Sequence, residues 1–391
     1  IPKIRFYSYQ GAWTENKIAD IVKISAGGDV DKVKLKESGK YPVIANALTN
    51  KGIVGFYDDY KVKAPAVTVT GRGDVGYAVA RHENFTPVVR LLTLQSENID
   101  VDYLENQINS MRILNESTGV PQLTAPQLGN YKVYHPEMEE QSAIGSLFRT
   151  LDDLLASYKD NLANYQSLKA TMLSKMFPKA GQTVPEIRLD GFEGEWEKTT
   201  LEKSTDRVKS YSLSRDVETN QDTGLKYIHY GDIHLGKVSM IDDGNSIPYI
   251  KTDTKLSEFL QQGDLIFADA SEDYKGIAEV AVVVDALSEK IVAGLHTIAV
   301  RPQSIFDSIF LYFMFKTQTF RKYGYKVGTG MKVFGISPSN LMKYEFYYPD
   351  KKEQQAIGFY FSNLDNLINS HQEKISQLET LKKKLLQDMF I

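Results

Sequence analysis

The stretch Glu140-Gln141-Ser142-Ala143-Ile144-Gly145 decides the architecture of this chain, because it returns as Glu353-Gln354-Gln355-Ala356-Ile357-Gly358. The offset between the two copies is 213 residues (353 − 140 = 213). Identical or similar residues continue at the same offset over about forty positions, which is not a chance match and marks an internal duplication. Further pairs at this offset are Phe148 with Phe361, Leu151 with Leu364, Lys169 with Lys382, and Met176-Phe177 with Met389-Phe390.

Apolar residues in both copies follow one another at alternating spacings of four and three, which predicts long helices that pack along their length. We expect one spacer helix within residues 136–180 and a second within residues 349–391. Pro136 and Pro349 suit the first turns. At 1.5 Å per residue, about forty residues make a rod of roughly 60 Å. The predicted helix–helix seam consists of Ile144, Phe148, Leu151, Leu155, Leu162, Ile357, Phe361, Leu364, Ile368 and Ile375.

A second apolar line runs beside this seam in both copies. A pair of helices would leave part of that line exposed, which favours the docking of a partner protein. Packing against the globular regions of the same chain is the alternative. The predicted partner-docking residues are Leu147, Leu154, Leu168, Tyr360, Leu367 and Leu381.

Each half also opens with a related segment, since Pro2-x-Ile4-Arg5 before Trp13 is echoed by Pro185-x-Ile187-Arg188 before Trp196. Globular regions therefore cover residues 1–135 and 181–348. Both mix β-rich runs with short helical patterns. The β-rich runs are 66–70, 88–92, 264–267 and 280–284, and short helices are expected at 101–113 and 305–320. The fold class is α+β, with two mixed globular domains and two long helices.

Composition limits the possible functions. The 391 residues contain no cysteine, so disulfides and thiolate metal sites are excluded. The formal net charge of −4 means that any nucleic-acid surface must be a local patch. The longest apolar stretch, Ile305 to Phe315, is too short to cross a bilayer. We expect a cytoplasmic protein.

A search for catalytic motifs predicts no catalytic residue and no metal ligand. The chain has no Pro-Pro pair of the kind that an adenine methyltransferase motif contains. The segment Gly231 to Lys237 approaches a phosphate-binding loop, but Val238 stands where a hydroxyl residue would hold magnesium. Histidines are scattered without the spacing of a metal site.

The duplicated motif, with an aromatic-Pro before it and a heptad helix ending in Met-Phe after it, resembles the specificity subunit of type I restriction–modification systems. The two openings before Trp13 and Trp196 resemble the entry to the target-recognition domains of that family. One departure is that the first half has Tyr41-Pro42-Val43-Ile44-Ala45-Asn46 where the second has the family form. Other family-like signatures are Tyr227-Ile228-x-x-Gly231-Asp232-Ile233, Gly328-Thr329-Gly330 and Ile336-Ser337-Pro338.

The resemblance implies two target-recognition domains joined by two antiparallel helices in a pseudo-twofold arrangement. Each domain would read one half of a split, asymmetric double-stranded DNA site, and the helices would set the unread spacer. Two modification subunits would dock on the helices and methylate adenine N6 with S-adenosylmethionine. Restriction subunits would add ATP- and magnesium-dependent translocation and cleavage, and the chain itself would hold no cofactor. A methylation-only system remains open.

Two readings lie outside this family. One is a duplicated module on a coiled-coil stalk that binds something other than DNA. The other is an enzyme with an unrecognised site.

Candidate DNA contacts are basic residues next to glycines or aromatic residues. Arg72 stands between Gly71 and Gly73 after a β-rich run, where glycines allow close approach to a ligand. An ordinary tight turn with a solvated or paired Arg72 is the alternative. Lys275 holds the corresponding place in the second half if Gly76 aligns with Gly276 and Ala78 with Ala278. The remaining candidates are Arg207, Lys209, Tyr211, Arg215, Lys326 and Lys332.

Overall fold

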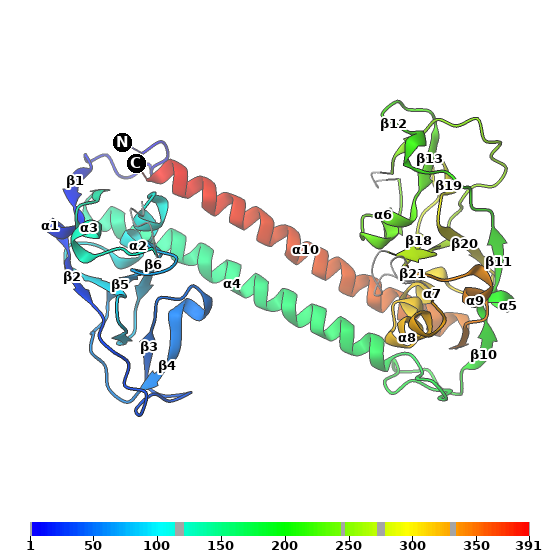
Figure 1. The fold of residues 1–391 in the computed structure, drawn as a ribbon, viewed down its shortest axis with the longest axis horizontal. Coiled ribbons are helices and arrows are strands. Elements are labelled where there is room, and N and C mark those ends of the chain that lie inside the picture. The colour runs from blue at the N-terminus through cyan, green and yellow to red at the C-terminus, as the bar shows by residue number, and fades with distance from the viewer. Residues whose placement is uncertain (1, 114–120, 244–246, 272–277, 329–333, 391) are drawn as a thin grey trace. The chain divides into compact units, whose positions relative to one another are not determined.

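The computed structural model describes residues 2–113, 121–243, 247–271, 278–328 and 334–390 (Figure 1). The chain divides into two compact units, each built from both halves of the sequence. Unit 1 comprises residues 1–161 and 371–391, and unit 2 comprises residues 162–370. The predicted α+β class is confirmed, because each unit combines antiparallel-rich sheets with helices.

Unit 1 contains a four-stranded antiparallel sheet in the order β2-β8-β5-β6, a smaller sheet in the order β4-β3-β7, and the pair β1-β9. Its strands are β1 (Thr14–Lys17), β2 (Lys23–Ala26), β3 (Tyr41–Ile44), β4 (Ile53–Tyr57), β5 (Ala66–Val69), β6 (Ala78–Arg81), β7 (Thr86–Pro87), β8 (Leu92–Gln95) and β9 (Lys132–His135). Its short helices are α1 (Ile18–Ile21), α2 (Val101–Ser110) and α3 (Ala125–Gly129), with a 3-10 turn at Thr49–Gly52.

Unit 2 has the corresponding sheet, β11-β20-β16-β18, extended by β14, and a second sheet in the order β12-β15-β13-β19. Its strands are β10 (Glu197–Thr200), β11 (Thr205–Val208), β12 (Glu218–Thr219), β13 (Leu225–Ile228), β14 (Met240–Ile241), β15 (Tyr249–Ile250), β16 (Leu265–Ala268), β17 (Ala270–Ser271), β18 (Val280–Val283), β19 (Lys290–Ala293), β20 (Thr297–Pro302), β21 (Phe334–Gly335) and β22 (Glu345–Tyr348). Its short helices are α5 (Leu201–Ser204), α6 (Tyr230–His234), α7 (Ser308–Phe315), α8 (Gln318–Val327) and α9 (Pro338–Met342), with a 3-10 turn at Arg215–Val217.

Strand registers define which residues of the two units are counterparts. Leu94 lies opposite Val67 and Ile24, whereas Val300 lies opposite Leu265 and Arg207. The next bridge agrees, since Arg72 faces Gln122 in unit 1 and Ala270 faces Gly335 in unit 2. The main sheets of the two units therefore share one framework, from β2-β8-β5-β6 in unit 1 to β11-β20-β16-β18 in unit 2.

The structure corrects three details of the sequence analysis. The run 88–92 is not one strand: β7 ends at Pro87, β8 begins at Leu92, and Arg90 between them has a φ of +68°. The expected helix at 305–320 is two helices, because Thr317 caps a new one by accepting a hydrogen bond from Phe320 N. The alignment of Ala78 with Ala278 is also wrong, since Ala78 faces Val69 and its counterpart by register is Val280.

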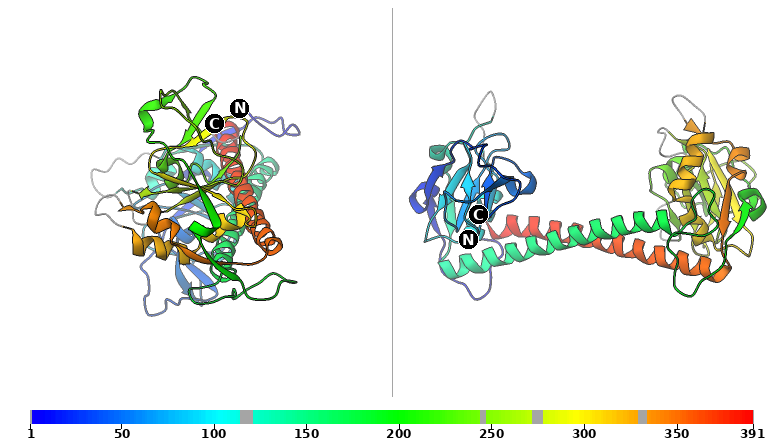
Figure 2. Two further views of the ribbon diagram at one scale, coloured as in Figure 1. Left: turned by 90° about the vertical axis from the view of Figure 1, so that its right-hand side faces the viewer. Right: turned by 90° about the horizontal axis from the view of Figure 1, so that it is seen from below.

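The long helices α4 (Met138–Lys175) and α10 (Lys351–Met389) are each continuous in the structure (Figure 2). In unit 1 they run antiparallel, since Asp152 pairs with Lys382 at 2.5 Å and Lys159 with Glu379 at 2.7 Å. In unit 2 the counterpart of the first pair is the ion pair between Lys169 and Asp365. The same contact, exchanged between the two helices, thus occurs once in each unit.

The duplicated motif Glu-Gln-x-Ala-Ile-Gly joins each long helix to its domain. In unit 1, the buried carboxylate of Glu140 accepts two hydrogen bonds of 2.6 Å from Arg5. Gln141 accepts a bond from Asp100 N and donates one to Pro136 O. A Cβ on Gly145 would lie 2.8 Å from Tyr103 N, so only glycine permits this approach of α2.

Unit 2 repeats these contacts with the same residue types. Arg188 donates two hydrogen bonds of 2.7 Å to Glu353. Gln354 accepts a bond from Asp307 N and donates one to Pro349 O. The motif is therefore a structural joint, with buried polar groups that are all satisfied.

The last residues of each long helix complete the core of the other half's domain. Phe390, directly after α10, packs against Tyr103 and Phe148, with ring centroids 5.4 and 5.6 Å away. Phe177, after α4, packs against Phe310 and Phe361 at 5.5 and 6.0 Å. The largest hydrophobic core of each unit is thus assembled from both halves of the sequence.

Candidate nucleic-acid interface

The connection from β5 to β6 holds Arg72 in a tightly bonded loop. Thr70 Oγ1 accepts a hydrogen bond from Tyr77 N at 2.9 Å, and Gly76 N donates to Thr70 O at 2.8 Å. On the other side, Leu123 N donates to Gly71 O at 2.9 Å. The backbone around Arg72 is clamped from both sides, whereas its side chain is exposed.

A second loop, between β7 and β8, touches the first. A Cβ on Gly71 would lie 2.2 Å from Arg90 O, so the two backbones are in direct contact. Asn46 bridges them: its Oδ1 accepts from Gly71 N at 2.8 Å, and its Nδ2 donates to Val89 O at 3.0 Å. Sequence reasoning did not single out Arg90, since apolar neighbours made the segment resemble a strand.

The arginines of unit 1 fall into two groups, those whose side chains have an ion-pair or hydrogen-bond partner and those without one among the described residues. Arg5 pairs with Glu140, Arg149 lies 3.9 Å from Asp102, and Arg81 donates to Thr68 Oγ1 and Lys51 O. The other group is Arg72, Arg90 and Arg112. Among the described residues, none of these three side chains has an ion-pair or hydrogen-bond partner, and all three are exposed.

These three arginines belong to backbone segments that lie next to one another in unit 1. Arg72 and Arg90 belong to the two touching loops, and Arg112 directly precedes Ile113, whose Cβ would lie 2.7 Å from a Cβ on Gly76. Uncompensated guanidinium groups suit phosphate oxygens and guanine edges, which they bind with two parallel hydrogen bonds. This part of unit 1, whose three arginine side chains have no ion-pair or hydrogen-bond partner among the described residues, is the candidate nucleic-acid interface, and we call it the basic edge.

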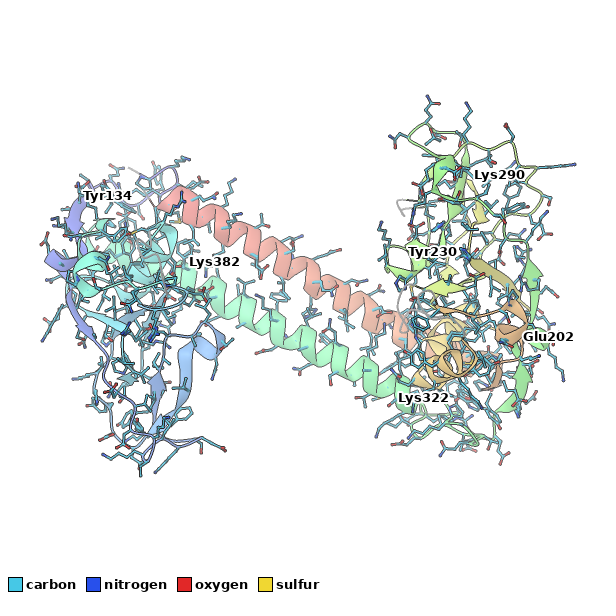
Figure 3. The ribbon with its side chains drawn as sticks, in the orientation of Figure 1. Tyr134, Glu202, Tyr230, Lys290, Lys322 and Lys382 are labelled. Carbon is cyan, nitrogen blue, oxygen red and sulfur yellow. The ribbon has the colours of Figure 1, made fainter. Side chains whose placement is uncertain are left out.

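The counterpart in unit 2 has a different set of side chains. Asp269 stands where unit 1 has Gly71, and its Oδ1 lies 3.0 Å from His296 Nδ1. Burial raises the pKa of the Asp269 carboxyl, and the adjacent His296 opposes that effect. Tyr230, labelled in Figure 3, meets the His296 ring edge to face at 5.5 Å. The predicted contacts Lys275 and Lys332 fall outside the described residues.

The remaining predicted DNA contacts of unit 2 do not form one group. Arg207 and Lys209 are exposed, and Lys209 Nζ lies 5.1 Å from the Tyr211 ring centre. Arg215 forms ion pairs with Asp232 and Glu218, so its charge is already compensated within the protein. Lys326 is exposed on α8 and lines a pocket of about 540 Å³ with Tyr323 and Lys343.

Tyr211 is a poor candidate for a DNA contact. It is only 5% exposed, and its hydroxyl accepts hydrogen bonds from Ser257 N and Glu258 N. A side chain buried in this way anchors the loop at 257–258 and has no free face for a phosphate. The basic residues around Tyr211 suggested a DNA contact, because the sequence does not show which of these side chains faces the core.

The predicted seam and docking residues differ in exposure. Of the seam, Leu162 and Ile375 are half-buried and the other eight side chains are buried. Residues near the start of each helix pack on the domain as well as on the other helix, as Phe148 and Phe361 do. Of the docking line, Leu147 and Tyr360 are half-buried against their own domains. Exposed members are Leu154, Leu168, Leu367 and Leu381, between 37% and 44% accessible.

Two kinds of feature are missing from the part of the chain that the structure describes. No group of three or more His, Asp or Glu side chains is placed to hold a metal ion. None of the described helices combines the length and apolar character needed to span a bilayer.

Solved structures share this architecture. An S subunit of a type I restriction–modification system from M. genitalium superposes over 100% of this chain and 99% of its own, with a TM-score of 0.67 and 15% identity. A second structure, from work on complex assembly and conformational transition of the type I system, covers 97% of this chain and 98% of its own, with a TM-score of 0.52 and 15% identity. The fold is that of type I specificity subunits.

Sequence comparison shows the family. The model of the type I restriction modification DNA specificity domain matches this chain twice, at residues 10–164 and 214–380. The chain therefore belongs to the type I specificity-subunit family, and the resemblance inferred from the duplicated motif is confirmed.

Individual relatives are distant. The MjaVIII specificity subunit of Methanocaldococcus jannaschii is 21% identical over 279 residues, which cover 69% of this chain and 64% of that protein. A Mycoplasma pneumoniae protein described as a type I specificity subunit is 27% identical over 143 residues, 35% of this chain and 39% of that protein. These matches span less than two thirds of either relative.

Proposed function

We propose that this chain is the DNA-reading subunit of a type I system and recognises a bipartite, asymmetric target, one half-site for each unit. The observation that carries the proposal is the duplication itself. Two DNA specificity domains on one framework differ in the side chains at the edge where their loops meet. Two readers with different side chains call for two different half-sites.

The chemistry is proposed to come from partner subunits. Two modification subunits would dock on the long helices and use S-adenosylmethionine to methylate adenine N6. Restriction subunits, where present, would supply ATP- and magnesium-dependent translocation and cleavage. The exposed leucines support the docking step, because Leu154 of unit 1 recurs as Leu367 of unit 2, and Leu381 of unit 1 recurs as Leu168 of unit 2. Two equivalent apolar patches suit two copies of one partner.

The DNA reading is tested with the assembled complex of this chain and its modification subunits. The probe is a duplex library with about 40 random base pairs, enough for two half-sites one or more helical turns apart. We expect enrichment of two unrelated short sequences separated by an unread spacer of constant length. Enrichment of one uninterrupted sequence, or of none, would refute the proposal.

Partner docking is tested separately by co-purification. Leu154→Asp with Leu381→Asp should remove one modification subunit, and adding Leu168→Asp with Leu367→Asp should remove both. Asn369→Asp serves as the control, since Asn369 is an exposed polar residue on the same helix as Leu381. Unchanged stoichiometry in the fourfold variant would exclude the leucine patches as the docking surface.

A further inference from the structure

Two residues hold matching backbone conformations that side chains other than glycine rarely adopt. Among the described residues, Arg90 has a φ of +68° and His296 a φ of +56°. This left-handed region is uncommon outside glycine and carries a cost for most other residues. In the same chain, glycine fills positions of this kind at Gly73 and Gly76.

Arg90 and His296 are counterparts in the shared framework. Each stands four residues before the matched strand positions Leu94 and Val300. Two residues before them, Val88 N donates to Ile44 O and Gly294 N to Ile228 O, both at 2.8 Å. The unusual conformation is therefore a property of this corner of the fold, present in both copies.

Both side chains are exposed, and neither contributes to a core. Arg90 has no partner among the described residues, and it adjoins the Arg72 loop through the Gly71 contact. His296 is hydrogen-bonded through Nδ1 to Asp269 Oδ1. Its other ring nitrogen, Nε2, has no hydrogen-bond partner within the described part of the chain. In both units, this corner has a backbone conformation that glycine would adopt at a lower free-energy cost. Each unit nevertheless holds an ionisable side chain there, Arg90 in unit 1 and His296 in unit 2.

We infer that Arg90 and His296 are DNA-contacting residues that determine specificity, one in each recognition domain. Arg90 would place a forked guanidinium beside that of Arg72, which suits the O6 and N7 atoms of guanine. His296, oriented by Asp269, would present Nε2 to a base edge or a phosphate. The inference rests on the proposed function and names residues that perform it.

The decisive variants are Arg90→Gly and His296→Gly, because they separate a structural role from a DNA contact. Glycine relieves the left-handed backbone, so each variant should melt about 2 °C higher than the parent or more. The same variants should bind the enriched duplex about 5- to 100-fold more weakly. A merely structural residue would not show stability and affinity moving in opposite directions.

Matched controls exclude effects of strain relief and of charge alone. Ala278→Gly relieves another left-handed residue, φ +58°, without removing a polar group, and should leave affinity unchanged. Lys17→Ala removes an exposed charge from β1 and should also leave affinity unchanged. Arg90→Lys keeps the charge but loses the fork, so binding should persist with relaxed sequence preference.

The random duplex library assigns each residue to a half-site. We expect Arg90→Gly to relax one or two positions in one half-site, and His296→Gly to relax positions in the other. If the parent complex enriches two half-sites but both glycine variants enrich the same sequences with the same affinity, this inference is overturned and the proposed function stands. A parent complex that enriches nothing would overturn the proposed function itself.

Discussion

Phe390→Ala should destabilise unit 1 far from the substituted residue in sequence. The Phe390 side chain is 7% exposed and contacts the rings of Tyr103 and Phe148. Truncating a core phenylalanine costs about 3–5 kcal/mol, because apolar contacts are lost and a cavity remains. For a unit of this size, that cost lowers the melting temperature by roughly 10 °C.

Hydrogen exchange followed by mass spectrometry locates the effect, and calorimetry gives its size. Amides of α2 and of the first turns of α4 should lose protection, whereas those of β16 and β20 in unit 2 should not. Phe359→Ala on the same helix is the control, because its side chain is 70% exposed and its loss should cost little. Phe177→Ala should produce the mirror result in unit 2. Unchanged protection of α2 in Phe390→Ala would refute a core shared between the two halves.

Three further substitutions test close or buried contacts: two are at the joints between domain and helix, and the third is at Glu105 of α2. Gly145→Ala should lower the free energy of unfolding by about 1–3 kcal/mol, because its Cβ would lie 2.6 Å from Asp100 Oδ1. Thermal melting, with Ser146→Ala as the control, measures this loss. An unchanged melting temperature would contradict the close approach. Arg188→Met should lower the free energy of unfolding by about 3–5 kcal/mol, because it leaves the buried Glu353 carboxylate unpaired. Adding Glu353→Gln to this variant should recover part of the loss, as measured by urea unfolding. No recovery would argue against the broken ion pair as the cause. Burial, reinforced by Asp152, raises the pKa of Glu105 from 4.5 to about 7, so the folded state holds this proton more tightly than the unfolded state does. The contribution of this group to the free energy of unfolding is complete below pH 4.5 and falls as the pH rises to 7. Glu105→Gln should remove this fall and raise the free energy of unfolding by up to roughly 3 kcal/mol at pH 8. Parallel profiles of unfolding free energy against pH for parent and variant would disprove the raised pKa.

The long helices and the duplication were predictable because they depend on local periodicity. Spacings of four and three place Ile144 and Phe148 on one face whatever the tertiary contacts are. The role of the motif was not predictable in the same way. That Glu140 meets Arg5, or that Phe390 meets Tyr103, depends on which distant segment arrives, and spacing within a helix carries no such information.

Local sequence was misleading where one residue departs from its neighbours. Apolar residues around Arg90 favour a strand, yet its left-handed conformation ends β7 and delays β8. Basic residues around Tyr211 favour a surface, yet its hydroxyl is needed inside to hold Ser257 N. In both cases the tertiary structure overrides a preference worth only a fraction of a kcal/mol per residue.

Comparison of the two units distinguishes residues that maintain the fold from residues that differ at the candidate interface. The Arg5–Glu140 pair recurs as Arg188–Glu353, with the same two hydrogen bonds from guanidinium to carboxylate. At the basic edge the counterparts differ: Arg72 corresponds to Ala270, and the loop that follows is four residues longer in unit 2, since the register offset rises from 198 to 202 between these strands.

Folding alone accounts for the retained joints, because leaving one partner of a buried ion pair unpaired costs about 3–5 kcal/mol. Exposed loops carry no such cost, so their side chains are free to differ between the two units, as the proposed bipartite target requires.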